Sequence, residues 1–151
     1  MLTASGPKVV EFNCRLGDPE TQCVLPIFDG DLADLLEAAA RGRLDAFGDA
    51  PPPRESAAVV VLASGGYPGP YRNGLRIDGI GDAEALPGVQ VLHAGTRLQD
   101  GHLATSGGRV LGVCGRGPTL KAALDAAYAG VERIRFEGMH YRTDIGKKGL
   151  R

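Results

Sequence analysis

Three polar side chains occupy alternate positions near the start of the sequence, at Glu11, Asn13 and Arg15. The stretch around them alternates apolar and polar residues, which predicts a β-strand whose successive side chains point to opposite faces. The carboxylate, the amide and the guanidinium should therefore share one face. On the other face, Phe12 should pack into the core, and Cys14 should act as a small buried apolar residue.

This row of three groups suggests a site for a divalent cation and an anion. Glu11 and Asn13 offer hard oxygen atoms, which Mg²⁺ prefers, and Mg²⁺ usually takes one or two protein ligands beside phosphates and water. Arg15, about 7 Å further along a strand, can hold a carboxylate or phosphate through two hydrogen bonds. Spacing alone leaves an alternative, a solvated strand face with an incidental ion pair.

A helix start follows the row. Asp18 is predicted as its N-cap and Pro19 as its first residue, with Pro26 ending the helix early. Free N–H groups at such an end can receive an anion, although a plain N-cap explains the residues equally well. A second helix is predicted from Asp31 to near Gly42, with an apolar stripe formed by Leu32, Leu35, Leu36 and Ala39.

The remaining elements predict an α+β fold. Residues 1–15 suggest a hairpin with a first arm of three residues, so the opening reads as the interior of a longer protein. Strands are expected over 57–63, 88–96, 103–105, 109–114 and 134–136, with a hairpin turn at Asp100-Gly101. Thr119 should cap a long amphipathic helix. Together these elements predict a small, mostly antiparallel sheet packed by one long helix.

Composition narrows the class of protein. The 151 residues are 43% hydrophobic and 23% charged, which is typical of a globular domain. A net charge of −1 argues against nucleic-acid binding. The longest apolar run, 57–63, is too short to cross a membrane, and no secretory signal is visible. Three cysteines without metal-site spacing suggest reduced thiols in a cytoplasmic protein.

Residues 11–22, Glu-Phe-Asn-Cys-Arg-Leu-Gly-Asp-Pro-Glu-Thr-Gln, resemble a motif of the phosphoribosylamine–glycine ligases, or glycinamide ribonucleotide synthetases. These ATP-grasp enzymes act in purine biosynthesis. The sequence is similar to their C-terminal third over essentially its whole length. Four further motifs occur in the expected order, at 63–68, 93–96, 105–111 and 142–146.

The resemblance implies an enzyme that uses ATP to join glycine to 5-phosphoribosylamine through a glycyl phosphate. Glu11 and Asn13 match the family's ligands for Mg²⁺ or Mn²⁺, and Arg15 matches a catalytic-site arginine that we expect to clamp the glycine carboxylate or acyl phosphate. By the last motif, Arg142, Asp144 and Gly146 are expected to bind substrate. A structural ion pair between Arg142 and Asp144 is the alternative.

The resemblance also divides the chain. Residues 1–44 are expected to end an ATP-grasp domain, 45–56 to form a linker, and 57–151 to form the family's C-terminal α+β domain. Most of the family's nucleotide site has no counterpart here, so we expect no activity from the chain alone. The partners are then ATP, glycine, 5-phosphoribosylamine and the missing N-terminal ATP-grasp portion.

Two alternatives remain at this stage. One is a separately encoded interaction subunit with an exposed apolar surface around residues 1–28, and the other is a folded domain without activity. Two groups have no assigned role. His93 is more readily explained as a hydrogen-bonded core residue than as a catalytic one, and residues 107–109 form either a tight turn or a close approach to substrate.

Overall fold

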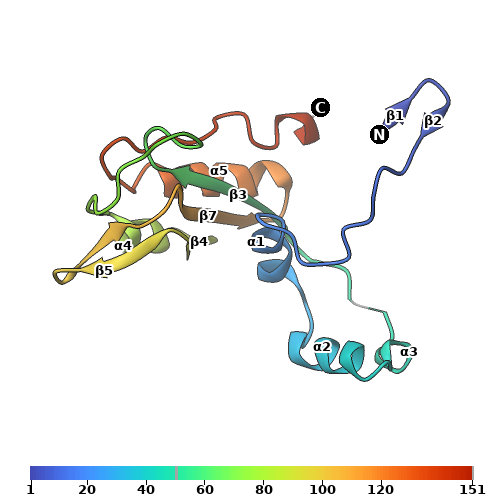
Figure 1. Ribbon diagram of the computed structural model, residues 1–151. Helices are drawn as coiled ribbons and strands as arrows, with labels where there is room; N and C mark the ends of the chain where they lie inside the picture. The colour runs from blue at the N-terminus through green and yellow to red at the C-terminus, as the bar shows by residue number, and fades with distance from the viewer. Residues whose placement is uncertain (50, 151) are drawn as a thin grey trace.

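A three-stranded antiparallel sheet lies at the centre of the fold (Figure 1). The computed structural model describes residues 1–49 and 51–150. The long central strand β7 (Arg109–Gly117) pairs with β3 (Ser56–Ala63) on one side and β4 (Val89–His93) on the other. The predicted strands over 57–63 and 109–114 are confirmed. Their apolar runs are continuous because elements pack against both faces of the sheet.

Helix α5 (Leu120–Val131) covers one face of the sheet. Thr119 caps it as predicted, because its hydroxyl oxygen accepts a hydrogen bond of 3.2 Å from the Ala122 N–H. The helix approaches β7 closely at Gly115, where a Cβ would overlap backbone atoms of Ala123 and Ala127. The core between helix and sheet includes Val60, Leu62, Val110, Leu111, Val113, Ala127, Val131 and Ile134.

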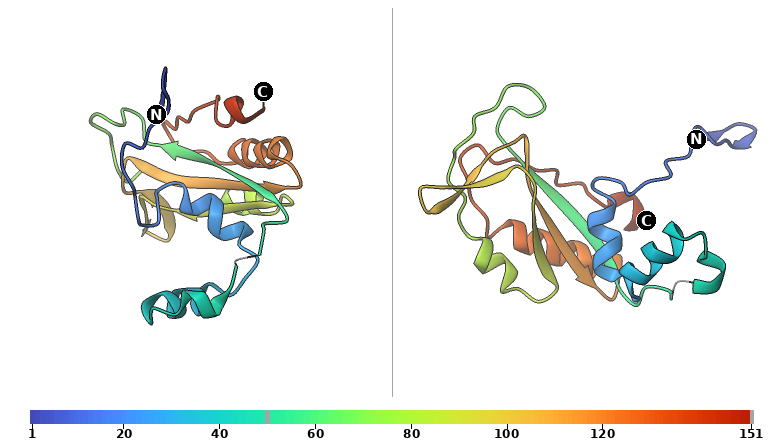
Figure 2. Two further views of the ribbon diagram at one scale, coloured as in Figure 1. Left: turned by 90° about the vertical axis from the view of Figure 1, so that its right-hand side faces the viewer. Right: turned by 60° about the horizontal axis from the view of Figure 1, so that its bottom comes forward.

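The opposite face carries helix α1 (Thr21–Val24) and the 3₁₀ turn η1 (Leu25–Ile27), as Figure 2 shows. The early end of this helix is as predicted. Its predicted cap is wrong, because Glu20 occupies the N-cap position without a side-chain hydrogen bond. Asp18 instead accepts hydrogen bonds from Gln22 and Arg109. The Asp18 carboxylate therefore binds Arg109, 91 residues further along the chain, and does not cap the helix.

A second hairpin joins β5 (Thr96–Gln99) to β6 (His102–Thr105). Asp100 and Gly101 take positive φ values of 49° and 77°, so the predicted Asp-Gly turn is confirmed. The strand expected over 134–136 is an isolated bridge between Arg135 and Asp78. Helix α4 (Ile80–Glu84) is not predicted from the sequence, because it is too short to show helical periodicity. A 3₁₀ turn η2 (Lys147–Leu150) ends the described chain.

The N-terminal arm, residues 1–16, extends away from the sheet (Figure 1). Its hairpin is shorter than expected, with β1 (Leu2–Thr3) paired to β2 (Gly6–Pro7). The strand predicted over 8–15 is wrong, since no strand in the described part of the chain lies beside it to complete a ladder. Phe12 is 81% exposed and Cys14 is also exposed, so neither is a core residue here.

Helix α2 (Leu32–Ala40) begins where predicted, because the Asp31 carboxylate accepts hydrogen bonds from two backbone N–H groups of the first turn. Its apolar stripe is not buried, and Leu36 is 54% exposed. Helix α3 (Leu44–Phe47) follows and overlaps the start of the expected linker. An ion pair of 2.7 Å between Asp29 and Arg54 joins the two ends of this excursion.

We expect Phe12→Ala to change the free energy of unfolding of this chain by no more than about 0.5 kcal/mol, because the ring contributes little to the core. Thermal unfolding measures this. Leu111→Ala is the matched control, since Leu111 is 1% exposed and its truncation should cost about 2–5 kcal/mol. A comparable loss for Phe12→Ala would mean that the N-terminal arm folds onto the domain.

No helix in the described ranges is long and apolar enough to cross a membrane.

Candidate functional site

The side chains of Glu11, Asn13 and Arg15 form one hydrogen-bonded row on the exposed N-terminal arm. Asn13 Nδ2 donates to Glu11 Oε1 at 3.2 Å, and Arg15 Nη2 donates to Asn13 Oδ1 at 3.4 Å. The row forms although the strand does not, because the backbone bends locally: the Arg15 N–H donates to the Asn13 carbonyl at 2.9 Å, and the alternate side chains meet beside this bend. We call these three residues the Glu11 row.

The donor atoms of the Glu11 row fit Mg²⁺ or Mn²⁺. One carboxylate and one amide oxygen are hard ligands, and phosphate oxygens and water can complete an octahedron. Within the described residues, no group of three or more His, Cys, Asp or Glu side chains is arranged to hold a metal. A site that takes few protein ligands and shares the ion with substrate is therefore the kind that this donor set can form.

A cavity of about 220 Å³ lies between α1 and the face of the sheet that α5 does not cover. We call it the α1 cavity. Segments far apart in the sequence meet there, including parts of the motifs at 11–22, 93–96 and 105–111. Its lining consists of Asp18, Pro19, Gln22, Val59, Val61, Leu92, His93, Ala94, Arg109, Leu111 and Gly112.

Polar groups are concentrated at one side of the α1 cavity. Arg109 Nη2 contacts Asp18 Oδ2 at 2.8 Å, and Gln22 Nε2 donates to Asp18 Oδ1 at 3.1 Å. The Gln22 Oε1 atom is buried and lacks a hydrogen-bond partner within the described structure. His93 is exposed, with Nδ1 3.0 Å from the Thr96 hydroxyl, so its expected place in the core is wrong. The reason is that His93 ends β4, where the strand leaves the sheet.

The residues of the last motif lie elsewhere. Arg142 donates to both oxygens of Asp144, from Nε at 2.8 Å and from Nη2 at 2.7 Å. This hydrogen-bonded pair is solvent-exposed, and it lowers the pKa of the Asp144 carboxyl. The Tyr128 hydroxyl of α5 donates to the Arg142 carbonyl and accepts from the Ile145 N–H, which fixes the turn on α5. Gly146, at φ 74°, continues this turn against Leu124.

The structure therefore separates two groups of predicted site residues. Helix α5 and α1 cover opposite faces of the sheet (Figure 2). The turn at 142–146 lies over α5, whereas the Glu11 row continues into the segment that borders the α1 cavity. A substrate-binding role for Arg142, Asp144 and Gly146 stays a prediction, as do the metal-ligand roles of Glu11 and Asn13 and the catalytic role of Arg15.

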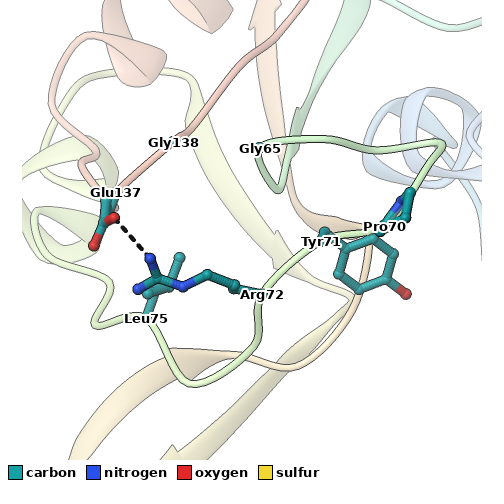
Figure 3. Close-up of a pocket in the computed structure, with 7 residues that line it drawn as sticks. All are labelled: Gly65, Pro70, Tyr71, Arg72, Leu75, Glu137 and Gly138. Atoms are coloured by element: carbon teal, nitrogen blue, oxygen red, sulfur yellow. Dashed lines mark hydrogen bonds and ion pairs between the residues drawn. The ribbon is translucent and has the colours of Figure 1, made fainter.

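A second, wider cavity of about 340 Å³ lies beside the loop that follows β3 (Figure 3). Arg72 and Glu137 form an ion pair of 3.3 Å at its side, and Tyr71 and Pro70 form another part of its wall. The motif at 63–68 pointed to this loop. Tyr71, Arg72 and Glu137 were missed because they lie outside every motif and carry no distinctive spacing.

Cys23 and Cys114 are poorly suited to act as nucleophiles. Burial raises the pKa of the Cys114 thiol to about 11, and burial also raises the pKa of Cys23. Both shifts keep these thiols protonated near neutral pH, and the thiolate is the nucleophilic form.

Comparisons with known proteins show which family and which relatives this chain is similar to. Residues 57–148 match the family described as phosphoribosylglycinamide synthetase, C domain. The chain is 50% identical over 151 residues to a phosphoribosylamine–glycine ligase of Synechocystis sp., covering 99% of this chain and 36% of that protein. A ligase of the same name from Caulobacter vibrioides is 50% identical over 154 residues, covering 99% of this chain and 35% of that protein.

A solved structure is also similar. The crystal structure of phosphoribosylamine–glycine ligase from Thermotoga maritima matches with a TM-score of 0.78 and 35% sequence identity. The match covers 95% of this chain and 34% of that one. The chain thus spans about a third of the length of these relatives.

Proposed function

This chain belongs to the phosphoribosylglycinamide synthetase family, and from that premise we propose that it supplies the C-terminal part of a phosphoribosylamine–glycine ligase. In that reaction ATP phosphorylates the glycine carboxylate, and the amine of 5-phosphoribosylamine then displaces phosphate from the acyl carbon. The products are glycinamide ribonucleotide, ADP and phosphate. The observation that carries the proposal is 50% identity to a ligase over 99% of this chain, a span that includes the Glu11 row.

The Glu11 row has a defined task in this proposal. Glu11 and Asn13 would hold Mg²⁺ or Mn²⁺, which when bound neutralises charge on the phosphoryl group being transferred. Arg15 would orient the glycine carboxylate, because a guanidinium can bind both carboxylate oxygens. No side chain of this chain needs to act as nucleophile, since the substrate carboxylate and amine supply both attacking atoms.

Exposed apolar residues of the N-terminal arm support the proposal that this chain binds another part of the ligase. Val9, Val10, Phe12 and Leu16 are each at least 64% exposed and follow one another closely in the sequence. Several large apolar side chains exposed within one short segment indicate an interaction surface. We infer that the arm packs against the part of the ligase that these 151 residues do not cover. We further place the reaction in the cytoplasm, where free thiols remain reduced.

A complementation experiment tests the proposed function. The purified 151-residue chain is mixed with a fragment of the Synechocystis ligase that contains the rest of that protein. Phosphate release is then measured with Mg·ATP, glycine and 5-phosphoribosylamine. We expect no turnover from either part alone and turnover that depends on all three substrates from the mixture.

Two results would contradict the proposal. One is robust turnover by the 151-residue chain alone, because the residues proposed here do not suffice to bind ATP. The other is association of the two parts, seen by gel filtration, without any ligase activity. An Arg76→Gln chain serves as a control, since Arg76 pairs with Asp78 on the surface of the C-terminal domain, away from the Glu11 row and the α1 cavity.

A further inference from the structure

We propose that the α1 cavity binds the phosphorylated ribose of the amine substrate, with Arg109 and His93 on the phosphate side. The inference rests on the proposed function for the identity of the sugar phosphate. Its starting point is a convergence: Asp18, His93 and Arg109 belong to three separate motifs, yet they line one cavity.

The size and lining of the cavity favour a small amphipathic metabolite. Its volume of about 220 Å³ is smaller than the ~300–1,000 Å³ typical of pockets for drug-sized ligands. Val59, Val61 and Leu92 supply apolar surface from the sheet, against which the C–H face of a sugar ring can pack. The side chains of Asp18, Gln22 and Arg109 contact one another beside this surface, so a ligand with one ionic end and one partly apolar body fits best.

Arg109 is held in a position from which it can bind a phosphate. Its ion pair with Asp18 leaves the two side chains 43% and 61% exposed, and an ion pair this exposed adds little net stability. A phosphate monoester offers a higher charge and two oxygens to the guanidinium. The exposed imidazole of His93 supplies a further donor from β4. Asp18 then competes with the phosphate for Arg109.

The position of the cavity along the chain suits the reaction. Asp18 lies three residues after Arg15, so their Cα atoms are at most about 11 Å apart. A ribose held by its phosphate in the α1 cavity can therefore extend its anomeric amine toward the Glu11 row. There the amine would meet the activated glycine carboxylate of the proposed reaction.

Calorimetric titration of the 151-residue chain with ribose 5-phosphate tests the inference. This probe is stable, lacks the amine, and needs neither ATP nor metal. We expect saturable binding to the wild-type chain and at least a tenfold weaker affinity for Arg109→Gln. His93→Gln, a second variant at an exposed position, should also weaken binding, and Arg76→Gln should not. Thermal unfolding confirms that each variant is folded.

Asp18→Asn gives the sharpest comparison. Removal of the competing carboxylate should strengthen ribose 5-phosphate binding severalfold, while the amide oxygen can still accept the hydrogen bond from Gln22. Free ribose and inorganic phosphate should each bind more weakly than ribose 5-phosphate, because each reaches one part of the site.

The inference is overturned if the folded wild-type chain shows no saturable binding, or if Arg109→Gln and Arg76→Gln bind equally well. Weaker binding by Asp18→Asn would also overturn it, since that result would mean that the Asp18 carboxylate assists binding and does not compete with the phosphate for Arg109. These outcomes are separate from those of the complementation experiment. Binding is measured without turnover, so a ligase that fails to assemble leaves the titration interpretable, and a silent titration leaves the ligase proposal standing.

Discussion

Glu11→Gln should lower the turnover of the complemented ligase by about 100-fold or more at a fixed Mg²⁺ concentration. Loss of even an outer-shell partner of a metal ligand costs about 10–100-fold in affinity or activity, so a direct ligand should lie at or beyond the upper end. Glutamine keeps the size and one oxygen of glutamate but removes the charge that attracts the cation. Because the side chain is exposed on the N-terminal arm, the melting temperature should not change.

A titration with Mg²⁺ makes this test specific. The variant should need more Mg²⁺ to reach half of its maximal rate, whereas loss of a purely structural group would lower the rate at every Mg²⁺ concentration. Glu132→Gln is the matched control, because Glu132 is an exposed carboxylate at the end of α5. Unchanged turnover together with a large fall in melting temperature for Glu11→Gln would reject the metal-ligand role.

Gly115→Ala should be the most destabilising single-methyl change in the sheet. The added Cβ would overlap the carbonyl oxygen of Ala123 and the amide of Ala127, and would lie 2.9 Å from the Ala127 Cα. These are backbone atoms of α5, so the helix must shift as a body. We expect a loss of about 3 kcal/mol, and thermal unfolding should show a melting temperature lower by roughly 6–12 °C.

Gly112→Ala is the control for this effect. It adds the same methyl group to the same strand, but on the face away from α5. There the nearest atom is the Val59 Cγ2 at 3.3 Å, the end of a side chain that can adjust. Its melting temperature should fall by much less. Equal falls for the two variants would mean that α5 does not pack against β7 as closely as described.

Local signals explain which elements were predictable. The continuous apolar run of β3, the Thr119 cap of α5 and the Asp100-Gly101 turn each encode their structure within a few residues, and all three are present. The prediction of a strand at 8–15 was wrong, although the residues there do alternate. A strand also needs a neighbouring strand to share its backbone hydrogen bonds. The apolar stripe of α2 is exposed for the same reason. Its spacing predicts which face of the helix is apolar, but it does not predict what packs against that face.

In the candidate site, too, local contacts could be predicted from the sequence and long-range contacts could not. The contacts within the Glu11 row join residues only two positions apart, so spacing along the chain could predict that these side chains meet. The α1 cavity depends on the contact between Asp18 and Arg109, which are 91 residues apart. No local pattern encodes such a contact. The exposure of His93 likewise depends on where β4 leaves the sheet, which its own sequence does not state.

The ion pair between Asp29 and Arg54 bears on how far the α2–α3 excursion can change in length. It joins the start and the end of the α2–α3 excursion, so the chain leaves and returns to the sheet at nearly the same place. The entropy of closing such a loop changes slowly with its length, by about 0.6 kcal/mol for each doubling. Changes in the length of this excursion should therefore cost this chain little stability, and the sheet and the α1 cavity should keep their arrangement.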